Sequence, residues 1–158
     1  MTHINERKLV TFSLSGRMFG IDMTTLIEIR EWEEPTPLPR VPGYIRGVAN
    51  LRGTVIPIVG LAERLGWTPS AVHARSCVLV VALTGGKQAG FLVDEVSDIV
   101  GIDAAAIQPA PEVEIAEPGV VAGLVPVALR SDQGERRTMV TLLDLDALGV
   151  TRQLDAAA

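Results

Sequence analysis

The stretch VANLRGTVIPIV, from Val48 to Val59, places a turn-like NLRG between two apolar runs. The flanking runs have the β-branched composition of buried strands. Gly53 gives the backbone the freedom that a tight turn requires, and Asn50 can form a local hydrogen bond. Pro57 predicts a position whose missing N–H is not needed, as at a sheet edge or a bulge. The stretch therefore predicts a hairpin whose turn needs Gly53 but does not need Arg52.

Short apolar runs of the same kind occupy the rest of the 158-residue chain. In these runs Val, Ile and Leu alternate with small or polar residues, and Gly, Pro or charged residues end each run. Long helical periodicity is missing. Two proline-rich segments, 33–43 and 108–119, predict rigid surface loops, and Asp103 can cap a short helix at AAAIQ. The pattern predicts an all-β barrel or sandwich.

The two halves of the chain resemble each other. When the chain is shifted by 70 residues, Gly16 falls on Gly86 and Ile29 falls on Ile99. Further along, VIPIVGL at 55–61 corresponds to MVTLLDL at 139–145, and each copy ends in a short helix-like segment. Such a repeat predicts two similar small β-barrels in one domain spanning 1–158.

A polar connector at 66–76 separates the two copies. Its position places the first barrel at about 8–66 and the second at about 76–149, with a C-terminal segment able to pack back on the first barrel. Both Pro69 and the polar composition of the connector agree with a crossing between subdomains.

Composition narrows the classes of function. A net charge of −5 and an aromatic content of 4% disfavour a nucleic-acid surface, which needs a basic face and stacking platforms. No apolar run approaches the roughly 18 residues of a membrane helix. The polar start MTHINERK is unlike a secretory signal, and the single cysteine, Cys77, agrees with a reducing compartment. The chain is therefore expected to be cytoplasmic.

Candidate catalytic and metal-binding groups are sparse. The two histidines, His3 and His73, lack the spacing and the cysteine neighbours of a metal site. GGK at 85–87 lacks the first glycine of a phosphate-binding loop and reads better as a hairpin turn. SLSG at 13–16 lacks the glycine that precedes a nucleophilic serine. We expect no enzyme, no cofactor and no metal.

Several motifs, in a consistent order from about Leu9 to Gly149, carry a resemblance to a known family. They are FGID at 19–22, IEIR at 27–30, PGYIRGVANLRGTVIPIVGL at 42–61, FLVDEVSDIVGI at 91–102, AIQPAPE at 106–112, GLVPV at 123–127 and VTLLDLDALG at 140–149. Together they resemble the CheW family of chemotaxis coupling proteins. The signature of a glycine followed by NLRG and then VIPI is specific to this family.

The resemblance implies a fold and a function. It implies two similar five-stranded SH3-like β-barrels packed on a shared hydrophobic core, with short helices and a short C-terminal helix. Family members have no catalytic activity and connect the histidine kinase CheA to the cytoplasmic tips of methyl-accepting chemoreceptors. The receptor tip docks near the groove between the barrels. The kinase's regulatory domain joins CheW barrel end to barrel end in rings, and CheW is thereby recruited to membrane receptor arrays.

Four positions match the family's partner-sensitive residues: Leu26, Glu28, Arg52 and Val78. The resemblance implies that Glu28 and Arg52 form an ion pair at the surface of the first barrel. Exposed pairs contribute only about 0–1 kcal/mol, so such a pair would orient a docking face rather than hold the fold. The groove between the barrels, around Leu26 and Val78, is the place where exposed apolar residues would be most informative.

One position departs from the family pattern. Gly60 stands where the family commonly has aspartate, whereas the repeat counterpart, Asp144, keeps the acid. This departure puts in doubt any cap or partner contact made at position 60.

Two alternatives remain open at this point. One is an adaptor of the same family that serves a different kinase pathway, such as surface motility or second-messenger control. The other is a small-molecule-binding or enzymatic β-barrel, which a deep polar pocket with convergent ionisable groups would support.

Overall fold

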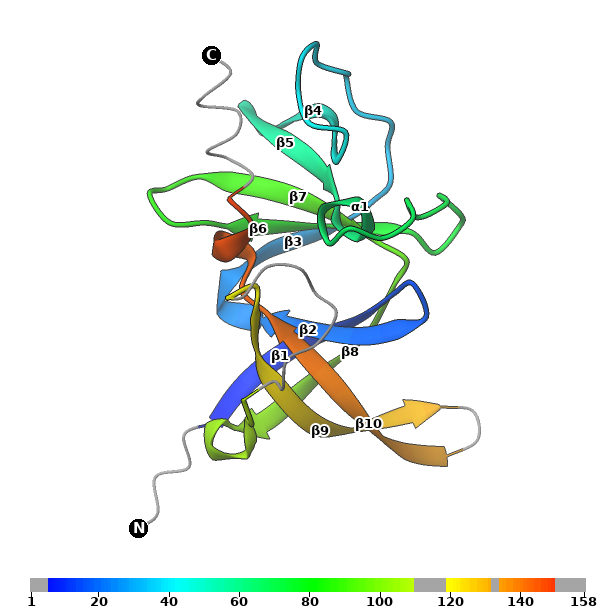
Figure 1. Ribbon diagram of the computed structural model, residues 1–158, viewed down its shortest axis with the longest axis vertical. Coiled ribbons are helices and arrows are strands. Elements are labelled where there is room, and N and C mark those ends of the chain that lie inside the picture. The colour runs from blue at the N-terminus through cyan, green and yellow to red at the C-terminus, as the bar shows by residue number, and fades with distance from the viewer. Residues whose placement is uncertain (1–5, 110–118, 132–133, 150–158) are drawn as a thin grey trace.

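Two five-stranded sheets make up most of the structure, a computed structural model that describes residues 6–109, 119–131 and 134–149. One sheet, of order β3-β6-β7-β5-β4, curls into barrel 1, and the other, of order β8-β1-β2-β10-β9, curls into barrel 2 (Figure 1). Barrel 1 contains β3 (Leu26–Glu31), β4 (Ile45–Leu51), β5 (Thr54–Gly60), β6 (Cys77–Ala82) and β7 (Gln88–Val93). Barrel 2 contains β1 (Glu6–Leu14), β2 (Arg17–Asp22), β8 (Glu95–Asp103), β9 (Val121–Ser131) and β10 (Gly134–Leu143). The predicted fold class is confirmed.

Short helices connect the strands. They are η1 (Met23–Thr25), α1 (Leu61–Arg64), η2 (Ala104–Ala106) and η3 (Leu145–Leu148), of which the three η elements are 3₁₀ helices. The carboxylate of Asp103 accepts the backbone N–H of Ala105 at 2.9 Å and begins η2, as predicted. The first proline-rich segment is a loop, whereas residues 110–118 of the second lie outside the described residues.

The division of strands between the barrels differs from the predicted boundaries at 8–66 and 76–149. The hairpin β1–β2 belongs to barrel 2, and the hairpin β6–β7 belongs to barrel 1. Each half of the chain thus contributes one hairpin to the barrel formed mainly by the other half. The two hairpins are placed in the same way, because β2 pairs in parallel with β10 just as β7 pairs in parallel with β5. A sequence repeat identifies which strands are alike, but it does not determine which of two like strands pairs with a given neighbour.

Local details of the two copies agree with the predicted repeat. Ile27 on β3 and Ser97 on β8 are both the extra residue of a β-bulge. Gly47 and Gly123 both lie against an incoming backbone, at Thr36 and Gln108, where a Cβ atom would be within 3 Å of a carbonyl oxygen. The repeat is therefore present in the backbone as well as in the sequence.

The buried side chains of the described residues form three clusters, one inside each barrel and one between the barrels. On β6, Val78 and Val80 face the interior of barrel 1, whereas Leu79 and Val81 face the core between the barrels. Residues on successive positions of a strand point to opposite faces, so a strand with two buried faces reads as a continuous apolar run. The shared core receives side chains from both sheets, from α1 and from η3. This confirms the predicted shared hydrophobic core.

The hairpin of β4 and β5 has the predicted turn. Gly53 has a φ of 86°, and its N–H donates to the Asn50 side chain at 2.9 Å. Leu51 pairs with Thr54, and Arg52 also has a positive φ, of 54°, which together give a type I′ turn.

The prediction for Pro57 is only partly right, because β5 is an inner strand rather than an edge. Pro57 pairs with Val48, whose backbone N–H and C=O both bond to Thr36 instead of to β5. The parallel ladder between β5 and β7 begins one residue later, at Ile58. The proline therefore has no ladder bond to lose.

Candidate partner-binding site

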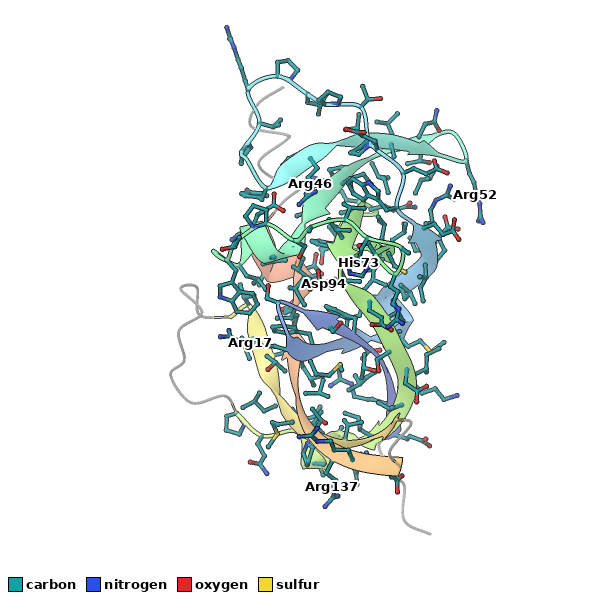
Figure 2. The ribbon with its side chains drawn as sticks, turned by 90° about the vertical axis from the view of Figure 1, so that its right-hand side faces the viewer. Arg17, Arg46, Arg52, His73, Asp94 and Arg137 are labelled. Carbon is teal, nitrogen blue, oxygen red and sulfur yellow. The ribbon has the colours of Figure 1, made fainter. Side chains whose placement is uncertain are left out.

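Glu28 and Arg52 meet at one end of barrel 1. Arg52, in the turn between β4 and β5, donates from Nη2 to Glu28 Oε2 on β3 at 3.4 Å. Glu28 is also 3.6 Å from Arg30 Nη1. The side chain of Arg52 is 79% exposed, whereas that of Glu28 is only 22% exposed. Figure 2 shows Arg52 projecting away from the end of the barrel. The predicted ion pair is present.

The backbone conformation of Arg52 does not suit an arginine. Type I′ turns prefer Asn, Asp or Gly at this position, because a positive φ brings the Cβ atom of other residues close to the carbonyl oxygen. An L-residue in this region costs about 1–2 kcal/mol. An exposed ion pair contributes about 0–1 kcal/mol, so the contact with Glu28 does not offset that cost.

A cavity opens beside this ion pair. β3 and β4 are the outer strands of the sheet in barrel 1, and they face each other across a seam. The cavity at this seam, here called the seam cavity, has a volume of about 230 Å³. It is lined by Arg30 and Glu31 of β3, residues 33–36, residues 48–51 of β4, and Ile58 and Val78.

Val78 lies at the bottom of the seam cavity rather than on the surface. It is 4% exposed and packs with Ile56, Ile58 and Val80 inside barrel 1. Leu26 lies elsewhere, at the first residue of β3, where it packs against the core between the barrels. Leu26 and Val78 therefore do not line one groove, because their side chains belong to different clusters.

Two exposed apolar residues of β3 were missed by the sequence reasoning. Ile27 and Ile29 are each more than 40% exposed, and they alternate with the less exposed Leu26, Glu28 and Arg30. The alternation of LIEIRE contains this signal, but it does not show which of the two faces is outward.

A second cavity, of about 300 Å³, lies between the barrels. Its lining includes Arg7 of β1, Asp22 of β2, Thr24 of η1, and Asp144 and Asp146 at the end of barrel 2. The guanidinium of Arg7 donates to Asp22 at 2.8 Å. Burial raises the pKa of Asp22, but hydrogen bonds from Thr24 and Arg7 outweigh this effect and leave the pKa below its ordinary value. The sequence reasoning did not single out this pair.

Gly60 allows Glu63 to fold back over the start of α1. A Cβ atom at position 60 would lie 2.0 Å from Glu63 Oε1, so the carboxylate of Glu63 occupies the space of a side chain at position 60. Glu63 in turn accepts from Arg46 Nη2 at 2.6 Å, and Arg46 also donates to the Ser70 carbonyl. In barrel 2, Asp144 itself caps η3 by accepting the N–H of Asp146.

Neither metal-ligand nor membrane features were found in the part of the chain that the structure describes. Within residues 6–109, 119–131 and 134–149, no three His, Cys, Asp or Glu side chains are grouped so that they could hold a metal ion. The same residues contain no helix long and apolar enough to cross a membrane. His73 accepts the N–H of Arg75, whereas His3 lies outside the described residues.

Comparison with known proteins gives the family. A model of the CheW-like domain matches residues 8–152. The chain belongs to the CheW-like family. It is 37% identical, over 96% of this chain and 93% of the relative, to a protein of Rhizobium etli described as "Probable chemotaxis protein CheW". It is 34% identical to the chemotaxis protein CheW of Rhizobium meliloti, over 96% of this chain and 92% of the relative.

A solved CheW structure has the same fold. The crystal structure of the scaffolding protein TtCheW from Thermoanaerobacter tengcongensis superimposes with a TM-score of 0.77 at 29% sequence identity. The superposition covers 92% of this chain and 89% of that chain. The CheW-like fold is thus shown over nearly the whole chain, whereas the roles of Leu26, Glu28, Arg52 and Val78 stay predictions.

Proposed function

We propose that this chain is a non-enzymatic scaffold that couples the cytoplasmic tips of chemoreceptors to the histidine kinase CheA in chemotaxis. Two findings support the proposal: the family match over residues 8–152 and the likeness to a structure described as a scaffolding protein. The chain would act in the cytoplasm, at arrays of membrane receptors. It would bind both partners without chemistry of its own.

The single observation that carries the kinase-binding part is that Arg52 combines a positive φ with an ion pair to Glu28 at the end of barrel 1. An arginine occupies a turn position that asparagine or glycine would fill at lower cost, and its side chain is 79% exposed. Strained residues cluster at functional sites, where binding requires a particular side chain. The Glu28 carboxylate holds this arginine over β3, next to the seam cavity. We assign the regulatory domain of CheA to this end of barrel 1.

The receptor tip is assigned to the cavity between the barrels. This cavity draws residues from both barrels, so a helical hairpin seated there would contact both. Its lining combines apolar residues of β6 and β10 with the ion pair of Arg7 and Asp22, which offers both apolar and polar contacts to a docked helix.

The first prediction concerns Arg52. Arg52→Glu places a second carboxylate beside that of Glu28, so binding of the CheA regulatory domain should weaken by at least about tenfold. The receptor tip should bind the variant as tightly as it binds the original chain. Isothermal titration calorimetry with each purified partner measures both affinities, and a thermal melt shows whether the fold is retained.

Arg40→Glu is the matched control. Arg40 is also exposed and also has a positive φ, of 60°, but it lies in the proline-rich loop. We expect Arg40→Glu to leave kinase binding unchanged. If both variants lose affinity equally, the effect is one of net charge and the assignment to Arg52 fails. Absence of binding to both partners by the unmodified chain would overturn the proposed function itself.

A further inference from the structure

The geometry of the seam cavity points to a ligand of defined chemistry. We propose that it takes the side chain of a lysine or arginine carried by an extended segment of the partner protein that docks at the end of barrel 1. This inference rests on the proposed scaffold function, since it names the chemistry of the partner at that site.

The bottom of the cavity suits a hydrocarbon chain. Val78 and Ile58 are each 4% exposed and form the floor. The floor cannot recede, because it is packed against Gly90, where even a Cβ atom would lie 2.7 Å from Val78. Lysine and arginine bury their methylene stems against apolar surface while they keep the charged group in water.

The rim carries carboxylates that have no ion-pair partner among the described residues. Glu31, Glu33 and Glu34 line the opening, and all three are exposed. The one cationic side chain in the lining, Arg30, is already beside Glu28. An acidic side chain would be repelled at this rim, and an apolar side chain would form no ion pair with the three carboxylates. A cationic side chain with a long methylene stem can pack its stem against Val78 and Ile58 and place its charge beside the carboxylates of the rim.

The size and surroundings of the cavity agree with one side chain from a protein partner. Its volume of about 230 Å³ is below the roughly 300–1,000 Å³ of small-molecule sites. The outer strands β3 and β4 flank it. The edge of β4 is already paired with Thr36 at Val48, so β3 is the outer strand that can pair with an extended segment of another chain. This arrangement gives Val78 a role in partner binding although it is buried, because it forms the floor on which the incoming stem rests.

Side-chain analogues test the inference without any partner protein. Nuclear magnetic resonance of the Val78 and Ile58 methyl groups is followed while n-butylammonium, n-propylguanidinium or 1-butanol is added. We expect saturable shifts with the two cations and weaker binding of the alcohol. In the triple variant Glu31→Gln, Glu33→Gln, Glu34→Gln, the affinity for the cations should fall by on the order of tenfold, because each exposed ion pair contributes up to about fivefold.

Two further variants serve as controls. Ala49→Leu narrows the cavity from its β4 wall and should abolish the methyl shifts, with the fold confirmed by the remaining spectrum. Glu135→Gln removes an exposed carboxylate from barrel 2 and should change nothing. Equal affinity for butylammonium and butanol, or an unchanged affinity in the triple variant, would overturn the inference.

The same triple variant is then titrated with the CheA regulatory domain and, separately, with the receptor tip. We expect the kinase affinity to fall by on the order of tenfold and the receptor affinity to stay constant. If the unmodified chain binds the kinase and the triple variant binds it equally well, the inference is wrong and the proposed function stands. If the unmodified chain binds neither partner, the proposed function fails. Self-association of the unmodified chain and of the triple variant is compared by analytical ultracentrifugation. If the triple variant self-associates less, the occupant of the seam cavity is a second copy of this chain, and the assignment to a partner protein is overturned.

Discussion

At the residue scale, Gly60 and Glu63 act as a pair. The carboxylate of Glu63 lies where a side chain at position 60 would project, and it holds Arg46 at 2.6 Å. The guanidinium of Arg46 also lies over the Trp32 ring, 5.6 Å from its centroid, and bonds to the carbonyl of Ser70. An acid is therefore present at the start of α1, but it comes from Glu63, whereas at the equivalent place in barrel 2 it comes from Asp144.

This pairing predicts the effect of restoring an aspartate. Gly60→Asp alone forces Glu63 away from Arg46, so we expect the free energy of unfolding to fall by about 1–3 kcal/mol. In the double variant Gly60→Asp, Glu63→Ala, the new aspartate can cap α1 without a clash, so part of the loss should be recovered. Urea denaturation measures the free energy of unfolding of the single and the double variant. A double variant less stable than Gly60→Asp alone would show that the two positions are not coupled in this way.

At the element scale, the hairpin of β4 and β5 combines a turn with a docking residue. Gly53 suits its position in the type I′ turn, but Arg52 does not. Arg52→Asn gives the Asn-Gly sequence that this turn prefers. We expect the variant to gain up to about 1 kcal/mol in free energy of unfolding and to bind the CheA regulatory domain more weakly. Urea denaturation and calorimetric titration measure the two effects.

Arg52→Asn is expected to raise the stability of the fold and to lower the affinity for the kinase. A variant that is stabilised and still binds the kinase as tightly would show that Arg52 is not a docking residue. A variant that is destabilised would show that the arginine supports the fold through Glu28.

The hairpin also shows how far sequence reasoning reached at this scale. The turn, the role of Gly53 and the contact of Asn50 followed from local chemistry, because the backbone of a two-residue turn allows few residues at each position. The position of Val78 did not follow. An apolar run buried on both faces does not show which side chains face the barrel interior and which face the neighbouring barrel. The seam cavity is therefore visible only in the folded chain.

At the scale of the whole molecule, each barrel depends on both halves of the chain. Barrel 1 needs the hairpin β6–β7, and barrel 2 needs the hairpin β1–β2. The shared core draws on both sheets, and Arg64 of α1 donates from Nε to the Leu148 carbonyl of η3 at 3.1 Å. The predicted boundary at 66–76 followed the repeat correctly but separated strands that pair in space, since pairing depends on contacts that a repeat pattern does not contain.

This exchange predicts a single cooperative unit. Neither fragment 1–66 nor fragment 76–158 contains all five strands of either sheet that the structure describes. We therefore expect neither fragment to unfold cooperatively, and the full chain to unfold in one transition. Scanning calorimetry and amide hydrogen exchange of the full chain and of each fragment measure this. A fragment with its own sharp transition would contradict the account of the shared fold.

The most direct test of the central claim measures coupling itself. A receptor signalling tip and the CheA regulatory domain, each labelled with a different dye, are sedimented together with and without the chain. We predict that the two labels co-sediment only when the chain is present, and that Arg52→Glu releases the kinase label while the receptor label stays bound. Co-sedimentation without the chain, or separate sedimentation in its presence, would contradict the account.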